Sequence, residues 1–483
     1  MRCNHCDNAP CVEICPVTAL YRREDGIVDF NNQRCIGCKA CMQACPYDAL
    51  YIDPETHTAA KCNYCAHRVD VGLEPACVNV CPTQAIISGD LDDPESRISQ
   101  TKDRNQVTAR KTEKGTVPAL FYINGDVDSL DPLSAPATDE TMWGTQVAGV
   151  GHWAADHEPH ALDRLGSLLD LGDSTAMLAE PEAKRRQEEL LDAVRPDAKR
   201  AYDAPQKGVL WGWQVSGYLW TKSVSAGACL LPLIAKTFGI AEVPVWLETF
   251  GYVTALLFLA ITGILLMWDL DQPKRFLYVL LRPQWKSWLV KGAYIITGFG
   301  GLLTACLLMN LFGGASAVLV QTAGIALLVF AVLAAIYTAF LFAQAKGRDF
   351  WQSPVLPIHM LTHSVAAGAA CFLLISPMVE SGEWLSFAKA TFVIAIGIHL
   401  ACDVFELFST HPTENGKRTA HSISHGRYRN LFWFGSVLIG GVVPVALLLM
   451  GNVMLPVAGV LALVGIFVGQ HIWVRAPQQI PLS

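Results

Sequence analysis

Twelve of the 16 cysteines lie within the first 81 residues and form three quartets. Each quartet closes with a Cys-Pro pair followed by a similar short stretch, so the quartets mark an internal repeat. Cysteines at such short spacings ligate metals. A repeat of this size is too small to bury a core alone, so we expect the metal to supply much of the cohesion. The quartets are Cys3, Cys6, Cys11 and Cys15; Cys35, Cys38, Cys41 and Cys45; and Cys62, Cys65, Cys77 and Cys81.

The spacing within the quartets favours iron–sulfur clusters. In the second quartet, three cysteines separated by two residues each are followed by a fourth after three more. Three thiolates on one tight loop can reach three irons of a 4Fe–4S cluster, and the fourth then ligates a neighbouring cluster. Zinc is the alternative, because pairs of cysteines two residues apart also make four-thiolate zinc sites. Zinc does not explain the third cysteine or the closing Cys-Pro, and no Cys-x2-Cys-His occurs to indicate c-type haem.

The second half of the sequence must be embedded in a lipid bilayer. Hydrophobic residues make up 52% of the sequence and charged residues only 16%, whereas soluble domains carry about 25% charged residues. From residue 209 onward the sequence is a series of apolar runs long enough to cross a membrane, which needs about 20 residues. Eight consecutive apolar helices leave no polar face for water. The predicted spans lie near 209–238, 245–268, 289–312, 317–343, 355–380, 384–408, 431–450 and 454–474.

The charges in the loops predict the orientation. An even number of spans puts both ends of the membrane region on one side, where most basic residues gather, and the opposite loops offer only Lys236 and Lys389. This asymmetry predicts a multi-pass protein of the cytoplasmic (inner) membrane with its cysteines on the cytoplasmic side, where reduced cysteines suit metal ligation. The basic loops also face an acidic N-terminal region, so docking is a second reason for their charge. They contain Lys274, Arg275, Arg282, Lys286, Lys291, Lys346, Arg348, Lys417, Arg418, Arg427, Arg429 and Arg475.

Polar residues at membrane depth are candidates for a quinone-binding region. Most lie in the cytoplasmic halves of the spans, within short reach of the expected clusters, and ionisable pairs there can exchange the protons of quinone chemistry. For each residue, an interhelical hydrogen bond or a side chain reaching toward the interface is an equally good explanation. The candidates are Tyr218, Lys222, His359, His363, His399 and Asp403, with Glu406 and His471 nearby.

Residues 1–125 resemble the four-cluster electron-transfer subunit of the complex iron–sulfur molybdoenzyme family. The matching motifs are the segments 3–15, 35–47 and 61–68, with Pro75-Ala76-Cys77. The resemblance implies that quartets exchange their fourth ligands. One cluster would then be held by Cys3, Cys6, Cys11 and Cys45, and another by Cys35, Cys38, Cys41 and Cys15.

The family pattern has four quartets, and the first of them is missing here. Cys62, Cys65 and Cys77 would therefore lack their exchange partner, and Cys81 would ligate a cluster with no other ligands. We expect a further quartet upstream of Met1, and a cluster closed by Cys81 itself is the alternative. About 16 irons in a chain expressed from the nearest upstream start would indicate four clusters, and about 12 would indicate three.

Residues 208–483 resemble the NrfD-type membrane subunit of polysulfide reductases. The motifs are the segment 211–222, Asp269-Leu270 with 273–276, Arg282-Pro283 with Ser287-Trp288, and Phe432-Trp433. The resemblance implies a haem-free, quinone-reactive anchor and a separate molybdopterin-containing catalytic subunit that docks on the cluster domain.

The expected fold is an α+β ferredoxin-like multi-cluster domain (residues 1–125), a polar linker (126–207) and an all-α eight-helix transmembrane domain (208–483). The expected function is electron transfer between the quinone pool and the molybdopterin subunit, with the substrate's catalytic site on another chain. The linker holds one amphipathic helical stretch near 181–195, and its His152, His157 and His160 are interpreted as loop residues. The acidic balance of −7 does not indicate nucleic-acid binding.

Two other functions stay open. The anchor could be a b-type cytochrome in which His359, His363, His399 and His471 supply axial ligands. The protein could also be a membrane-tethered ferredoxin that does not react with quinone. A haem absorption band would favour the first alternative, and reduced clusters that fail to reoxidise with quinone would favour the second.

Overall fold

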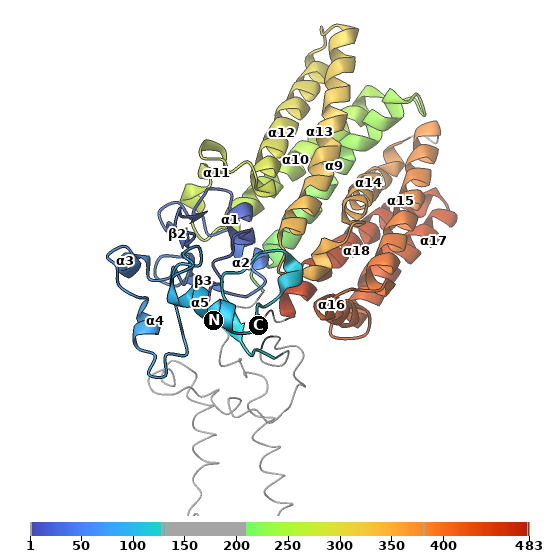
Figure 1. Ribbon diagram of the computed structural model, residues 1–483. Helices are drawn as coiled ribbons and strands as arrows, with labels where there is room; N and C mark the ends of the chain where they lie inside the picture. The colour runs from blue at the N-terminus through green and yellow to red at the C-terminus, as the bar shows by residue number, and fades with distance from the viewer. Residues whose placement is uncertain (1, 127–129, 131–208, 380–381, 481, 483) are drawn as a thin grey trace, which may run out of the picture. The chain divides into compact units, whose positions relative to one another are not determined.

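The computed structural model describes residues 2–126, 130, 209–379, 382–480 and 482 (Figure 1). Residues Met1–Leu133 and Gly208–Ser483 form one compact unit, so the cysteine-rich head (residues 1–125) and the helical body (208–483) can be described together. The stretch 181–195 and the three histidines of the linker lie outside the described residues.

The head is built from a short repeat. In its first copy, α1 (Pro10–Ile14) follows the first cysteines and leads into a hairpin of β1 (Leu20–Arg22) and β2 (Val28–Phe30). In the second copy, α2 (Ala40–Ala44) leads into a hairpin of β3 (Leu50–Asp53) and β4 (Thr58–Lys61). The proline after each fourth cysteine ends the helical turn, and α1 packs on α2.

The third copy is looser. Two single-turn helices lie among its cysteines: α3 (Ala66–Val69) begins directly after Cys65, and α4 (Ala76–Asn79) contains Cys77. Helix α5 (Arg97–Arg104) follows. The tail of the head is a short hairpin of β5 (Val107–Thr108) and β6 (Tyr122–Ile123), with the 3-10 turn η1 (Thr112–Lys114) between them.

Within the described residues, the body contains eight long helical segments within a few residues of the predicted spans (Figure 1). Short elements connect them, including η4 (Pro273–Arg275), α11 (Tyr278–Leu281), η5 (Asp349–Gln352), α16 (Glu414–Ser424) and η9 (Ala476–Gln479). The long segments are α9 (Trp213–Thr237), α10 (Val245–Trp268), α12 (Trp288–Phe312), α13 (Ala317–Gln344), α14 (Leu356–Leu374), α15 (Glu383–Phe408), η7 (Leu431–Val442) with α17 (Val443–Leu449), and α18 (Leu455–Arg475).

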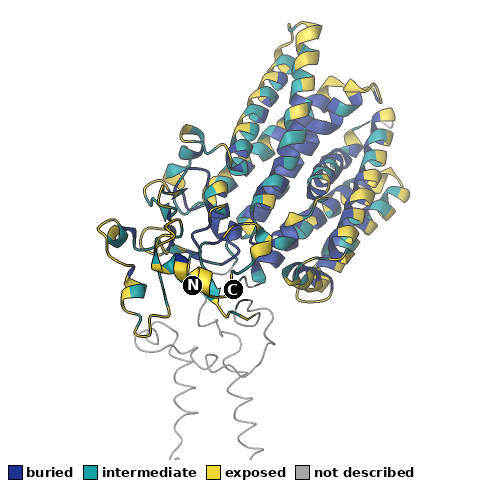
Figure 2. Ribbon diagram, viewed as in Figure 1, coloured by how far each residue is buried: buried dark blue, intermediate teal, exposed yellow. Residues whose placement is uncertain are grey.

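Seven of these segments are long and apolar enough to cross a membrane on their own, and α9 is the exception. Helix α9 packs against α10, α13, α14 and α18 and is buried over most of its length (Figure 2). It carries Ser216, Thr221, Lys222, Ser223 and Ser225, all buried. A helix surrounded by other helices can carry polar residues that bond to its neighbours, whereas the outer helices must present apolar side chains to lipid.

The head packs directly on the helix ends that carry the basic loops. Ser287, at the start of α12, donates a 2.7 Å hydrogen bond to the carbonyl oxygen of Ile14. Arg275 donates to the carbonyl oxygens of Asn32 and Cys35 at 2.7 and 2.9 Å. Gly37, at φ +71°, lies so close to Asp271 that an added Cβ would approach the Asp271 Cβ to 2.6 Å. The head and the basic loops therefore share one side of the body.

Candidate functional site

The first two cysteine quartets line two neighbouring hollows in the head. One hollow is lined by Cys3, Cys6, Cys11 and Cys45. The other is lined by Cys15, Cys35, Cys38 and Cys41. Each hollow thus takes three cysteines from one quartet and the fourth from the other, in the grouping that the family resemblance implied.

The chemistry of these hollows suits bound iron. Burial raises the pKa of the Cys6 thiol to about 12 and that of Cys45 to about 11. Four thiolates in one apolar hollow are therefore stable only when cations neutralise them, as irons do. Backbone N–H groups also point at the sulfurs: Ala19 donates to Cys15 at 3.3 Å, and Gly37 donates to Cys35 at 3.4 Å. The donor set fits a 4Fe–4S cluster in each hollow.

The third quartet is placed differently. Cys62 and Cys77 are exposed, and Cys65 and Cys81 are half-buried. The first two quartets bury each other, whereas the third faces outward from the repeat. The structure therefore brings together eight of the twelve expected ligands in two complete sets.

Trp211 joins the second hollow to the helical body. Its indole Nε1 donates to the carbonyl oxygen of Cys38 at 3.1 Å, and its ring stacks on Trp351 at 5.5 Å. Phe342 and Trp473 extend this aromatic group, with ring centroids 4.9 Å apart. The sequence motif contained Trp211 but gave no indication of its partner, because that contact joins residues 173 positions apart.

Arg348 is a second link that the sequence did not reveal. It is 8% exposed, and it donates to Gln43 Oε1 at 3.0 Å and to the carbonyl oxygens of Pro477 and Ile480 at 3.0 and 2.7 Å. Gln43 in turn donates to Gln478 Oε1 at 2.7 Å. One of the basic loop residues thus holds the second cysteine loop against the C-terminal segment.

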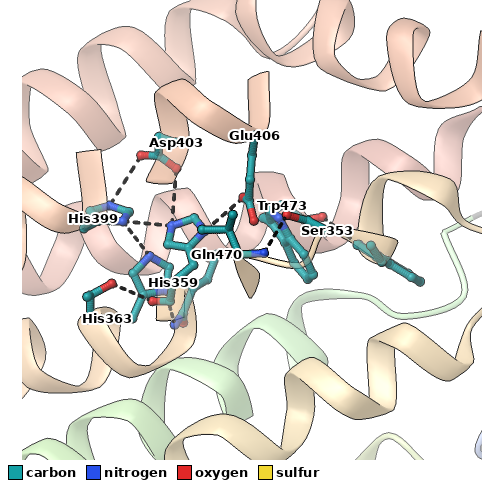
Figure 3. Close-up of polar contacts among 11 residues, drawn as sticks. Ser353, His359, His363, His399, Asp403, Glu406, Gln470 and Trp473 are labelled. Carbon is teal, nitrogen blue, oxygen red and sulfur yellow. Dashed lines mark hydrogen bonds and ion pairs between the residues drawn. The ribbon is translucent and has the colours of Figure 1, made fainter. Parts of the chain in front are cut away.

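A cluster of buried histidines lies between α14 and α15 (Figure 3). His359 Nε2 is 2.9 Å from His399 Nδ1, and His363 Nε2 is 3.1 Å from the same atom. His359 Nδ1 bonds to Glu406 Oε2 at 2.9 Å. Asp403 lies 3.4 Å from His359 and 3.5 Å from His399. The structure brings these candidates into one polar group, because their spacing in each helix puts them on facing sides.

The other two candidates, Lys222 and Tyr218, lie one turn apart on α9. The Lys222 Nζ donates to the carbonyl oxygen of Ala335 at 2.9 Å and to Thr338 Oγ1 at 2.7 Å, and it lies over the Tyr337 ring. Both side chains are buried. Lys222 is therefore anchored on α13 and makes no direct hydrogen bond to the histidines.

Gln470 of α18 connects α9 to the histidine cluster. Its amide nitrogen lies 3.1 Å from His363 Nδ1 and 3.3 Å from Ser223 Oγ. Ser223 is the residue that follows Lys222 in α9. The His471 side chain does not join the histidine cluster; its Nδ1 lies 3.2 Å from Ser216 Oγ of α9. The candidates predicted from the sequence did not include Gln470, and no spacing signal distinguishes it from the apolar residues around it.

The histidine geometry does not suit a haem between these residues. The three ring centroids lie 4.4–4.9 Å apart, and ring nitrogens contact one another directly. Axial ligands on opposite faces of a porphyrin must leave the macrocycle room between their rings. The cytochrome alternative therefore finds no support at His359, His363 and His399.

The two hollows and the apolar helices define a multi-pass membrane protein with a 4Fe–4S head. Residues 1–91 match the 4Fe-4S dicluster domain, and residues 203–481 match the family described as polysulphide reductase, NrfD. The second match covers more than half of the sequence, so the protein belongs to the NrfD polysulphide reductase family. The family resemblances seen in the sequence are confirmed.

The curated relatives match the head. The tetrathionate reductase B subunit of Salmonella typhimurium is 51% identical over 29% of this chain and 57% of its own length. The polysulfide reductase B polypeptide of Wolinella succinogenes is 47% identical over 25% of this chain and 64% of its own. The arsenate respiratory reductase iron–sulfur subunit of a Shewanella species is 36% identical over 25% of this chain and 72% of its own. The protein thus spans about 57–64% of the length of the first two of these relatives.

Proposed function

We propose that this protein is the electron-transfer and anchor subunit of a larger oxidoreductase, relaying electrons between the quinone pool and a molybdopterin-containing catalytic subunit. The observation that carries the proposal is the position of the second cysteine-lined hollow, directly on the ends of helices that also enclose a buried polar site. The relatives matched by the head are subunits of tetrathionate, polysulfide and arsenate reductases, which supports a catalytic partner of that class.

Bound 4Fe–4S clusters would supply one-electron transfer. The protein's own residues hold and orient them: Cys3, Cys6, Cys11 and Cys45 for one, and Cys15, Cys35, Cys38 and Cys41 for the other. We propose that Cys62, Cys65, Cys77 and Cys81 serve a further cluster at the outer end of the head. Trp211 attaches the second hollow to the residues just before α9. This contact keeps the distance between the cluster in that hollow and the buried polar site constant.

We propose that the quinone region comprises Tyr218, Lys222, His359, His363, His399 and Asp403. An ammonium group has three donors, and Lys222 uses two of them on α13. The third is available for a quinone carbonyl oxygen. The carboxylates of Glu406 and Asp403, which flank His359, can hold a proton and pass it on at this region.

The proposed location is the cytoplasmic membrane, with the head on the cytoplasmic side. The head shares one side of the body with the basic loops, and basic loops face the cytoplasm. Fusion of head and body in one chain fixes their ratio at one to one.

The test uses the full chain, purified in detergent and reduced with dithionite. We expect a menaquinone or ubiquinone analogue to reoxidise the clusters, and Lys222→Met to slow this at least about tenfold, the effect of losing about 1.4 kcal/mol. Lys389→Met is the matched control, since Lys389 is a half-buried lysine of the body that bonds to Asn452 and not to the polar site. Clusters that stay reduced with every quinone would favour the tethered ferredoxin instead.

A further inference from the structure

The three buried histidines direct their inner nitrogens at one another. His359 Nε2, His363 Nε2 and His399 Nδ1 belong to a group whose ligand atoms all lie within 4.8 Å of one another. Each of the three side chains is 3–4% exposed. Contacts between bare ring nitrogens are unfavourable unless a proton or a cation lies between them.

The outer nitrogen of each ring has its own partner. His359 Nδ1 faces Glu406 Oε2 at 2.9 Å, and His399 Nε2 faces Asp403 Oδ2 at 3.5 Å. A neutral imidazole carries one proton, so donation to Glu406 leaves the inner nitrogen of His359 as a lone pair. The Asp403 carboxylate makes no hydrogen bond through Oδ2, but its charge beside His399 Nε2 favours the His399 proton on that nitrogen, which leaves Nδ1 as a lone pair. Metal-binding histidines are oriented by carboxylates in this way.

The third ring follows the same pattern through Gln470. Its Nε2 is 3.1 Å from His363 Nδ1, while its Oε1 is buried without a hydrogen-bond partner. Amide oxygen and nitrogen are assigned from their surroundings, and a half-turn of this amide puts the oxygen on His363. The His363 Nδ1–H then donates to Gln470, and the His363 Nε2 lone pair also points inward.

Spacing and charge both suit a divalent ion. Nitrogens bound to tetrahedral zinc lie about 2.0–2.1 Å from the metal and hence about 3.3 Å from each other. The His359–His399 and His363–His399 separations of 2.9 and 3.1 Å need to open by only a few tenths of an ångström. The ligand atoms of all three rings lie within 4.8 Å of one another, so the remaining pair is also within reach of one ion. The carboxylates of Glu406 and Asp403 together bring two negative charges, which one divalent cation balances.

We propose that His359, His363 and His399 form a binding site for one divalent transition-metal ion of the zinc class, with Glu406, Asp403 and Gln470 orienting the rings. Three protein ligands leave a fourth position for water or another oxygen ligand. The site rests on the histidine geometry and not on quinone reactivity. A metal-free cluster, in which His359 is a cation held between Glu406 and Asp403, is the competing arrangement.

Metal content of the full chain tests the proposal. The protein is purified through an affinity tag without histidines, supplied with zinc alone, and passed through a desalting column with a weak chelator. We expect about one zinc per chain, with nitrogen or oxygen neighbours at about 2.0 Å in X-ray absorption spectra. In His399→Asn we expect zinc to fall at least about tenfold, the result of losing about 1.4 kcal/mol or more of binding free energy.

Two control variants keep the result decisive. His471→Asn changes a histidine outside the cluster and should retain the zinc. His363→Asp replaces one ligand by another and should retain part of it even if His399→Asn folds poorly, with folding followed by gel filtration and cluster absorbance. Zinc with sulfur neighbours at about 2.3 Å, zinc equal in wild type and His399→Asn, or no zinc in the wild type would each overturn the proposal. Quinone reoxidation is measured on the same samples, so the two proposals fail separately.

Discussion

Helices α9 and α14 cross at Gly227 and Gly368. An added methyl group at either glycine should force the two helices apart. A Cβ on Gly227 would lie 1.8 Å from the Ser364 carbonyl oxygen and 2.7 Å from the Gly368 nitrogen. A Cβ on Gly368 would meet the Gly227 carbonyl carbon and oxygen at 2.2 Å. A carbon and an oxygen in contact need about 3.3 Å, so Gly227→Ala must separate the two helices by about 1.5 Å.

This separation affects both stability and the polar site. Overpacking a well-packed core lowers the free energy of unfolding by about 1–3 kcal/mol. Here the atoms that the new methyl group meets belong to the backbone of α14, so they cannot move aside by a side-chain rotation. Small residues at such crossings also supply the close packing that holds membrane helices together. Helix α9 carries Lys222 and Ser223, and α14 carries His359 and His363. Opening the crossing therefore moves Lys222 away from the histidines.

Thermal unfolding of the full chain in detergent measures the effect. We expect Gly227→Ala to lower the melting temperature by at least about 5 °C and to slow quinone-dependent reoxidation. Gly263→Ala is the matched control, because its Cβ meets nothing within 4 Å and alanine favours a helix. Equal melting temperatures and equal rates for the two variants would refute the packing argument.

Three further predictions concern the head. Cys45→Ser should remove the cluster of Cys3, Cys6 and Cys11 alone, with a loss of about four irons per chain, and loss of all iron would contradict the two separate ligand sets. Arg348→Met leaves three buried acceptors without their donor and should cost about 3 kcal/mol in unfolding free energy; thermal unfolding unchanged from wild type would show that Arg348 does not hold the head. Burial raises the pKa of the Asp269 carboxyl to about 7, so the folded protein holds that proton more tightly than the unfolded chain and loses stability as pH rises from about 4 to 7. Asp269→Asn should therefore raise the melting temperature clearly more at pH 8 than at pH 5, and an equal effect at both values would contradict the assignment.

Sequence patterns predicted the helical body well because lipid imposes a simple rule on length and composition. The apolar run near 209–238 predicted helix α9, which the structure places at Trp213–Thr237, although α9 is the least hydrophobic of the long helices. The cysteine spacing likewise predicted ligands, since it reflects the local loop geometry of a cluster. These are local signals, carried by residues a few positions apart.

The sequence did not predict which side chains of different helices contact one another. The helical period indicated that His359 and His363 share a face, but not that this face meets His399 with ring nitrogens 2.9 Å apart. Gln470 looked like one more residue of an apolar helix, and only its position between Ser223 and His363 gives it a role. Such pairings depend on which helices become neighbours, which no single helix encodes.

Some of the basic loop residues contact the head, which gives a reason for their charge other than the orientation in the membrane. Arg275 and Arg348 bond to the head, so they would be needed on that side whatever the topology. The predicted orientation therefore depends on the remaining basic residues, which still greatly outnumber those of the opposite loops. Both opposite lysines are engaged as well: Lys236 pairs with Glu248 at 2.9 Å, and Lys389 bonds to Asn452. Discounting the engaged residues on both sides leaves the charge asymmetry intact, as the proposed cytoplasmic location of the head requires.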